Sequence, residues 1–289
     1  MSTRRPFRCL GLGEVLWDLL PGGRQLGGAP TNFTYHAHAL GAKAGLLSRV
    51  GNDELGREIL TCLTRLGVDT DGVTVEPHAP TGTVSVALDP QGHASYTIHE
   101  KVAWDFLEFT PAVRRAAEEA DAVCFGTLAQ RHAIARDTIR AVLRTVPPRA
   151  LRILDINLRQ QFYSPALVQD SLGLANVLKL NEHELPQLAQ WLALQGTEPE
   201  QLEQLARRYG LLALALTQGA RGSMLWLNGL LVSRPAAAVK VVDTVGAGDS
   251  YTAALALGLL AGEPADKIIE QAHRVAEYVC TQPGAIPAL

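Results

Sequence analysis

Short apolar runs rich in β-branched residues alternate with longer amphipathic runs along most of the chain. Two parallel strands need a long crossover connection, usually a helix, so this alternation predicts a parallel sheet with helices on both faces. Ligands bind such sheets at the carboxyl ends of the strands. We therefore expect an α/β fold, with helices that include 31–40 and 55–66 and with strands at 7–15, 44–50, 122–125, 153–156, 177–180 and 212–217.

Between residues 80 and 104 the alternation of strand-like and helix-like runs is interrupted. Residues 83–88 and 94–99 alternate apolar and polar side chains on either side of Asp89-Pro90-Gln91-Gly92, which is typical of a β-hairpin. We interpret segment 80–104, together with residues 18–28, as a small β lid. No stretch rich in Pro, Gly or Ser divides the chain, so residues 1–289 are expected to form a single domain.

The composition excludes several classes of partner. The formal net charge is −3, and no cluster of Lys and Arg is interleaved with aromatic residues, so we expect no nucleic-acid partner. The four cysteines form no Cys-x-x-Cys pair, which argues against a zinc site and fits a reducing compartment. No apolar run approaches the roughly 18 residues of a membrane span, so a cytoplasmic protein without a membrane partner is expected.

A carboxylate stands at the end of a glycine-punctuated turn in Asp243-Thr244-Val245-Gly246-Ala247-Gly248-Asp249, and an alanine-rich apolar run follows it. Gly246, Ala247 and Gly248 allow successive N–H groups to point into one concavity, to which the following helix adds the positive end of its dipole. The segment therefore predicts an anion cradle. Asp249 beside an anion is unfavourable unless it accepts a proton, as a general base in phosphoryl transfer does. The alternative is an ordinary loop-to-helix transition with an acidic first turn.

This stretch, continued to Ala254, resembles the C-terminal signature of the ribokinase-like (PfkB) carbohydrate kinases. A second stretch is similar to their N-terminal signature and reads Gly27-Gly28-Ala29-Pro30-Thr31-Asn32, then Leu40-Gly41-Ala42, then Arg49-Val50-Gly51-Asn52-Asp53-Glu54-Leu55-Gly56. The resemblance runs from Gly11 to about Ala285 and implies a ribokinase-like fold, in which a mostly parallel central sheet carries helices on both faces and a small β lid. It also implies an enzyme that uses ATP and Mg²⁺, with Asp249 as base and the cradle as the holder of developing charge.

The same resemblance implies which residues bind the sugar. Asp18 matches an Asp that accepts hydrogen bonds from sugar hydroxyls. Gly27, Gly28 and Asn32 match the sugar-binding loop, where missing side chains let the ligand reach the backbone. Arg159, in the sequence Asp-Ile-Asn-Leu-Arg, is similar to an Arg that fructokinase-like members place near the substrate or the transferring phosphoryl group. The residues alone also allow a solvated turn acid, a plain glycine turn and a structural ion pair of Arg159.

Two further motifs are implied to contact ATP. Asn181 and Glu184 match an Asn-x-x-Glu motif whose Glu acts on Mg²⁺ largely through water, as suits an ion that keeps its hydration shell. Thr217, Gly219 and Gly222 match a Thr-x-Gly-x-x-Gly turn beside the nucleotide. A helix-start acid and a strand-to-hairpin turn are the alternatives for these two motifs.

Gln282-Pro283-Gly284-Ala285 is similar to a family loop that, with the region of Asp243, can hold a monovalent cation such as K⁺. One departure concerns the adenine side. Where ribokinases often have Ala-Asn-Ala, this chain has Ala272-His273-Arg274, which leaves the adenine contacts open.

Other nucleotide-binding motifs do not fit the chain. Gly11-Leu12-Gly13 lacks the third glycine of a dinucleotide fingerprint because Leu16 occupies its place. No Gly-x-x-x-x-Gly-Lys-Ser/Thr occurs, so the cradle before Asp249 has to serve phosphate instead.

The substrate implied by the resemblance is fructose, phosphorylated on a primary hydroxyl. Gly13-Glu14, the Gly-Gly-Ala-Pro-Thr-Asn loop and the Asp-Ile-Asn-Leu-Arg strand look most like fructokinases, whereas ribokinases more often carry Gly-Gly-Lys-Gly-x-Asn. A 2-keto-3-deoxygluconate kinase or a ribokinase remains an alternative. A catalytically silent sugar or nucleotide sensor on the same fold is the alternative from another class. Family members often dimerise through such lids, which favours a homodimer; the alternative is a monomer in which the outer face of the lid meets solvent.

Overall fold

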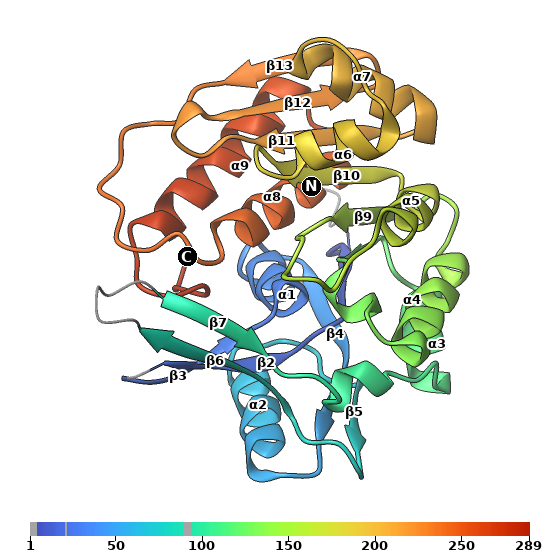
Figure 1. The fold of residues 1–289 in the computed structure, drawn as a ribbon, viewed down its shortest axis with the longest axis vertical. Coiled ribbons are helices and arrows are strands. Elements are labelled where there is room, and N and C mark those ends of the chain that lie inside the picture. Colours follow the sequence, from blue (N-terminus) through green and yellow to red (C-terminus); the bar gives the residue numbers. More distant parts are fainter. Residues whose placement is uncertain (1–4, 21, 89–93) are drawn as a thin grey trace.

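The computed structural model describes residues 5–20, 22–88 and 94–289. These residues form a nine-stranded sheet and a separate four-stranded sheet (Figure 1). The strands of the large sheet, in spatial order, are β13 (Leu230–Arg234), β12 (Ser223–Leu227), β11 (Ala213–Thr217), β10 (Val177–Asn181), β9 (Leu151–Asp155), β8 (Ala122–Phe125), β1 (Arg8–Leu12), β4 (Lys43–Gly51) and β5 (Val73–Glu76).

The large sheet is mostly parallel, as the alternation in the sequence predicts. Every neighbouring pair from β11 to β5 runs parallel, whereas β12 and β13 are added to its edge as antiparallel strands. The carboxyl ends of the parallel strands therefore meet at one edge of the sheet, where β9 ends at Asp155, β10 at Asn181 and β11 at Thr217. The predicted α/β fold is confirmed.

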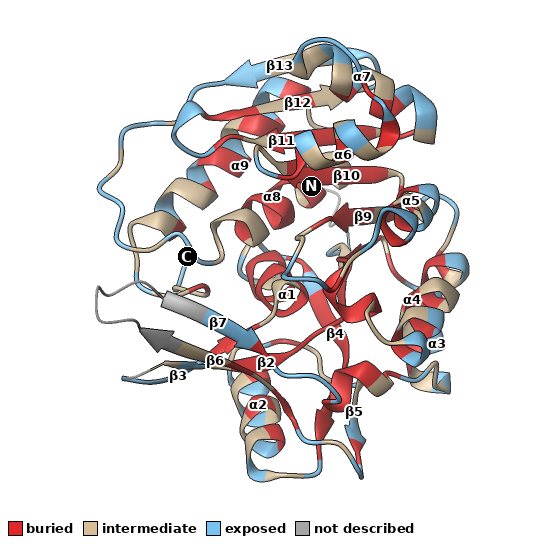
Figure 2. Cartoon of the chain, viewed as in Figure 1, coloured by how far each residue is buried: buried red, intermediate tan, exposed pale blue. Residues whose placement is uncertain are grey.

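Helices cover both faces of this sheet (Figures 1 and 2). One face packs against α1 (Ala29–Ala39), α8 (Ala247–Ala261) and α9 (Ala265–Cys280), and the other against α3 (Pro111–Glu118), α4 (Ala133–Thr145), α5 (Pro165–Leu174), α6 (Leu185–Leu192) and α7 (Glu198–Tyr209). Strand residues alternate between the two cores: Cys124 lies with α8 and α9, and its neighbour Val123 with α3 and α4. Such alternation follows from the two-residue period of a strand buried on both faces.

The small sheet has the order β3 (Gly23–Gly27), β2 (Leu16–Leu20), β6 (Gly82–Leu88) and β7 (Ala94–Ile98). The predicted hairpin is present, because β6 and β7 pair antiparallel from Val84–Ile98 to Leu88–Ala94. The turn predicted at Asp89-Pro90-Gln91-Gly92 lies outside the described residues. Helix α2 (Glu54–Arg65) packs between this sheet and β4, since Ile59 and Leu63 share a core cluster with Trp17 and Val50.

The prediction of one strand over residues 7–15 is wrong. Strand β1 ends at Leu12, and Gly13 adopts φ 144°, a conformation that only glycine reaches easily. The chain turns there and enters β2 of the small sheet, which carries Asp18. A mostly apolar run gives no periodic signal for such a bend.

Short 3₁₀ turns at Ala103–Phe106, Leu128–Gln130 and Gly219–Arg221 complete the secondary structure of the described segments. Among the helices in these segments, none combines the length and the apolar character that a bilayer span requires.

Candidate active site

Asp249, the predicted general base, lies in the first turn of α8. Its carboxylate accepts a 2.8 Å hydrogen bond from Nδ2 of Asn32, on α1. Burial and the neighbouring charge of Asp155 raise the pKa of Asp249 to about 6, although this hydrogen bond and the charges of Lys179 and Arg159 oppose the rise. A carboxylate of this kind is ionised at neutral pH yet more basic than an exposed one, as a general base should be.

The turn before α8 has the geometry of an anion cradle. Gly246 has φ 79°, and a side chain there would overlap the backbone oxygen of Ala285. The amide of Ala247 donates to Thr244 O at 3.3 Å, so it is turned into the loop. Within the described residues the amides of Gly246, Gly248 and Asp249 have no such acceptor. Within the described residues, two of the three predicted cradle amides, those of Gly246 and Gly248, are therefore free to bind a ligand, and the amide of Asp249 is free beside them.

The predicted sugar-binding residues converge on the loop between β3 and α1. A Cβ on Gly27 would overlap Asp18 Oδ2, and Gly28 has φ 107° and lies against the backbone oxygen of Glu14. The absence of side chains at both glycines is thus required by close approaches of Asp18 and Glu14. Burial raises the pKa of Asp18 to about 6, and the charge of Arg159 opposes the rise. Asp18, Gly27, Gly28 and Asn32 are brought together as the sequence predicts.

Two buried acceptors of this region have no hydrogen-bond donor among the described residues. They are Oδ1 of Asn32 and Oε2 of Glu14, whose residues are 5% and 4% exposed. Buried polar atoms are nearly always paired, so these two oxygens are free to bind hydroxyl groups of a ligand. Glu14 was not among the predicted site residues, although the sequence Gly13-Glu14 is one of the features that resemble fructokinases. Burial and the charge of Asp249 raise the pKa of Glu14 to about 7.

Arg159 follows β9 and is exposed. Its charge lowers the pKa of Glu14, Asp18 and Asp249 alike, so its guanidinium lies within electrostatic reach of the sugar residues and of the base. The next residue, Gln160, donates from Nε2 to Tyr96 O of β7 at 2.6 Å. The loop that carries Arg159 therefore contacts the small sheet.

Glu184 is 4% exposed, and each of its carboxylate oxygens accepts a backbone amide. Oε1 binds Leu158 N at 3.0 Å, and Oε2 binds Asn181 N at 2.8 Å. Asn181 Oδ1 in turn accepts the amide of His183 at 2.9 Å. Glu184 thus joins the loop after β9 to the loop after β10. One lone pair of each oxygen is engaged in this way, and the second lone pair of each remains available as an acceptor.

A cavity of about 540 Å³ lies between the carboxyl end of β11, the loop before α8, and helix α9. Thr217, Gly219 and Gly222, three of the predicted ATP residues, line it, whereas Asn181 and Glu184 do not. An apolar part of its wall is formed by Ala236, Ala237, Ala238, Val239 and Val241. His273 also lines the cavity, and its Nε2 lies 2.8 Å from Ser223 Oγ. The position that departs from the family pattern therefore faces the predicted nucleotide side.

Asp243 joins the loop before α8 to the loop after α9. Its Oδ1 accepts Val245 N at 3.0 Å, and its Oδ2 accepts Gly284 N at 3.1 Å. The predicted Pro-Gly-Ala loop and the Asp243 region are thus adjacent. Their oxygen donors are of the type that a hard monovalent cation takes.

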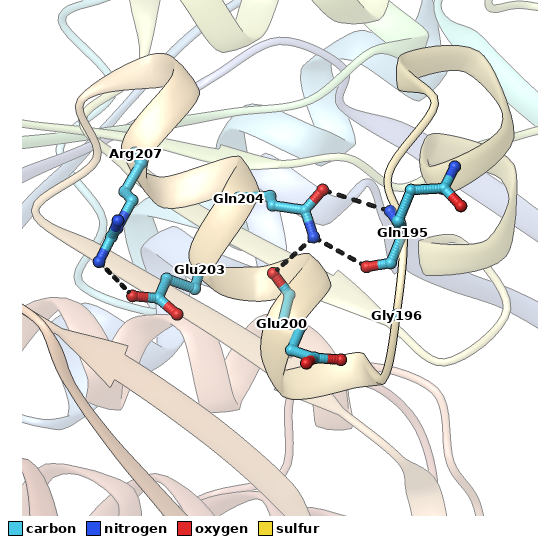
Figure 3. Close-up of a pocket in the computed structure, with 6 residues that line it drawn as sticks. All are labelled: Gln195, Gly196, Glu200, Glu203, Gln204 and Arg207. Carbon is cyan, nitrogen blue, oxygen red and sulfur yellow. Dashed lines mark hydrogen bonds and ion pairs between the residues drawn. The ribbon is translucent and has the colours of Figure 1, made fainter.

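A second hollow, on the outer surface of α7, is shown in Figure 3. Gln204 occupies its centre and binds both the backbone amide and the backbone oxygen of Gln195. Glu203 pairs with Arg207 at 2.6 Å. These polar groups satisfy one another, and the hollow contains none of the residues around Asp249.

A model of the family described as pfkB family carbohydrate kinase matches residues 22–289. The chain belongs to this family. It is therefore a sugar kinase, and the predicted class of enzyme is confirmed.

Three relatives of this sugar kinase show how far the similarity extends. It is 31% identical to a fructokinase of Klebsiella pneumoniae over 298 residues, covering 96% of this chain and 94% of that protein. It is 29% identical to a 2-dehydro-3-deoxygluconokinase of Thermoproteus tenax, covering 78% of this chain and 70% of that protein. A sugar kinase of Pyrococcus horikoshii, solved in complex with ATP, superposes with a TM-score of 0.79 at 26% identity, over 97% of this chain and 94% of the other.

Proposed function

We propose that this sugar kinase transfers the γ-phosphoryl group of ATP to a primary hydroxyl of fructose. The observation that carries the proposal is the position of Asp249, whose carboxylate is held by the sugar-loop residue Asn32 at the mouth of the anion cradle. The sugar hydroxyl oxygen would attack the γ-phosphorus, its proton would pass to Asp249, and the bond between the γ-phosphorus and the leaving ADP oxygen would break.

The chain's own groups serve each part of this reaction. Asp249 holds the proton at its carboxylate, which contributes about 10²–10⁴-fold in rate. The free amides of Gly248 and Asp249, at the positive end of α8, face developing negative charge. The unpaired oxygens of Glu14 and Asn32, together with Asp18, accept sugar hydroxyls. Binding and orientation should supply most of the remaining acceleration.

ATP is proposed to occupy the cavity lined by Thr217, Gly219 and Gly222, with its γ-phosphate directed to the cradle. The apolar walls at residues 236–241 suit an adenine ring, and the Pyrococcus relative binds ATP. Mg²⁺ bound to the phosphates would neutralise part of their charge. Glu184 would act on it through water, and Asp243 with the loop at Gly284 would hold K⁺.

The small sheet, built from parts of the predicted segments 18–28 and 80–104, is proposed to act as a lid. Asp18 on β2 links it to the sugar, and Gln160 links β7 to the loop of Arg159. Closure would exclude water, which otherwise competes with the sugar for the phosphoryl group. Tyr96 is 58% exposed, so the outer side of β7 offers an apolar group to the proposed homodimer.

Fructose is proposed over its alternatives because the fructokinase relatives match nearly the full chain. A 2-keto-3-deoxygluconate kinase is the second candidate, favoured by the Thermoproteus relative and by Arg159, whose exposed guanidinium could pair with a sugar carboxylate.

The test is an ADP-release assay with fructose, ribose, 2-keto-3-deoxygluconate, adenosine and fructose 6-phosphate. Fructose should give the highest kcat/KM, and Asp18→Ala should lose most of that activity because the sugar hydroxyls lose a charged acceptor. If 2-keto-3-deoxygluconate or the phosphorylated sugar wins by about tenfold or more, the fructose assignment is wrong although the kinase remains.

A further inference from the structure

Lys179 is a buried lysine of β10 whose ammonium lies directly behind the first turn of α8. Its residue is 5% exposed, between Leu178 and Leu180, which are fully buried. A Cβ added to Gly248 would lie 2.8 Å from Lys179 Nζ. The ammonium therefore fills the space that a side chain at position 248 would take, on the side of the cradle opposite to solvent.

A partner on the neighbouring strand fixes this ammonium. Lys179 Nζ lies 3.2 Å from Asp155 Oδ1, and Asp155 Oδ2 accepts a 3.0 Å hydrogen bond from Thr252 Oγ1 of α8. Thr252 Oγ1 also lies 2.9 Å from Gly248 O. An ion pair thus joins β10 to β9, and the hydroxyl of Thr252 joins β9 to α8, just below the cradle.

An ordinary buried position would favour an apolar residue here. Burying an ion pair costs desolvation free energy that its attraction only sometimes repays, so a buried pair is weak support for a purely stabilising role. Burial alone would lower the pKa of Lys179, but the charges of Asp155, Glu184 and Asp249 raise it above its usual value. Lys179 therefore carries its charge at neutral pH.

We propose that Lys179 is a positioning residue for phosphoryl transfer, whose ammonium, held by Asp155, places a full positive charge behind the Gly248–Asp249 amides of the cradle. This inference rests on the proposed function. The helix terminus by itself supplies only about half an elementary charge. A full charge at a buried position acts strongly on both the transferring phosphoryl group and the Asp249 carboxylate.

The ion pair has two members of opposite sign, which gives the inference a directional test. Asp249 is faced by Asp155 from β9, Lys179 from β10, Arg159 from the loop after β9, Glu14 from the loop after β1 and the amide of Asn32 from α1. The thiol of Cys124 on β8 completes the surroundings, and burial keeps it protonated by raising its pKa. Lys179 lowers the pKa of Asp249 and Asp155 raises it.

The experiment compares kcat/KM against pH for Lys179→Met, Asp155→Asn and the double variant, with Lys43→Met as the matched control. Lys43 is an exposed lysine at the other end of the sheet, at the start of β4. Lys179→Met should move the acid limb to higher pH and Asp155→Asn to lower pH, each by at least about half a unit. Lys179→Met should also lower kcat by at least about tenfold while the sugar KM stays within about threefold.

Circular dichroism and thermal melting establish whether each variant is folded. If Lys179→Met does not fold, the double variant replaces it, because it leaves no uncompensated buried charge; its kcat should be low while its acid limb returns toward that of the wild type. If the acid limbs of Lys179→Met and Asp155→Asn shift in the same direction, or if neither limb moves and kcat is unchanged, the inference is overturned. If Lys179 had a purely structural role, the variants would lose thermal stability, but the acid limbs of Lys179→Met and Asp155→Asn would not move apart.

ATP affinity without sugar, measured by calorimetry, separates this inference from the proposed function. Lys179→Met should weaken ATP binding more than Lys43→Met does, because the γ-phosphate loses a nearby positive charge. If the wild type phosphorylates no sugar of the panel, the proposed function fails, and equal ATP affinity of the two Lys→Met variants then overturns the role of Lys179 as well.

Discussion

Asn32 donates a hydrogen bond from Nδ2 to Oδ2 of Asp249 at 2.8 Å, across 217 residues of sequence. The donor belongs to the sugar-binding loop and first helix, and the acceptor belongs to the anion cradle. One amide therefore sets the distance between the two halves of the site. It also adjusts the basicity of Asp249, since a hydrogen bond to the charged form favours that form.

Replacing Asn32 by Ala should raise the pKa of Asp249 further above its value of about 6, because the donor that stabilises its carboxylate is lost. The acid limb of kcat/KM should then move to higher pH. Sugar KM should rise as well, since Oδ1 of Asn32 is a free acceptor for a hydroxyl. Rate profiles between pH 5 and about 9 check both effects, and an unshifted limb would separate Asn32 from the base.

Asp249→Asn should lower turnover by at least about a hundredfold, because the general base is lost, while ATP binding persists. Stopped-flow or coupled assays measure the rate, and calorimetry measures ATP affinity. Asp266→Asn, at an exposed first-turn position of α9, is the matched control and should be silent. Near-normal turnover of Asp249→Asn would remove Asp249 from the mechanism.

The same substitution should affect stability with a defined sign. The folded pKa of Asp249 is raised from 3.8 to about 6, so the native state binds the extra proton and the ionised form is destabilising. The wild type therefore loses stability as pH rises from about 4 through 6. Asp249→Asn should raise Tm by a few degrees at pH 8 and by less at pH 5. A lower Tm at pH 8 would contradict this.

A mostly parallel sheet with helices on both faces and the glycine turn before Asp249 could be predicted from sequence, because strand–helix alternation and glycine turns are local patterns. Asp18, Gly27 and Asn32 were predicted from the resemblance to the family, which rests on longer motifs. Lys179 could not be assigned, since one lysine within an apolar strand reads as an edge residue until its partner Asp155 on the next strand is known.

Local sequence patterns also could not predict the bend at Gly13 or the Oε2 of Glu14 that has no donor among the described residues. Both residues lie where the chain passes from the large sheet to the small sheet. The periodicity of apolar residues indicates that a segment is buried, but it does not indicate where the chain changes sheet. The directions of the amides in the cradle could not be predicted for a related reason, because they depend on the φ of Gly246.

Glu184→Gln should raise the Mg²⁺ concentration needed for half-maximal rate, with little change in sugar affinity measured without nucleotide. The neutral side chain keeps one oxygen for an amide but loses the charge that attracts hydrated Mg²⁺. Because Glu184 also holds the amides of Leu158 and Asn181, a loss of Tm is expected in parallel. A Mg²⁺ titration that is unchanged beside a lowered Tm would leave Glu184 with a structural role alone.

Gly27→Ala should raise the KM for the sugar by at least about tenfold and leave the KM for ATP almost unchanged. A methyl group at Gly27 would overlap Asp18 Oδ2, so the carboxylate must move away from the position in which it accepts sugar hydroxyls. A misplaced acceptor loses a charge-assisted hydrogen bond, which is worth about 1.5–3 kcal/mol. Gly22→Ala is the matched control, because Gly22 lies in the turn before β3 of the same sheet and a Cβ there would meet nothing within 4 Å. Equal sugar KM values for the two variants would show that Asp18 does not bind the sugar.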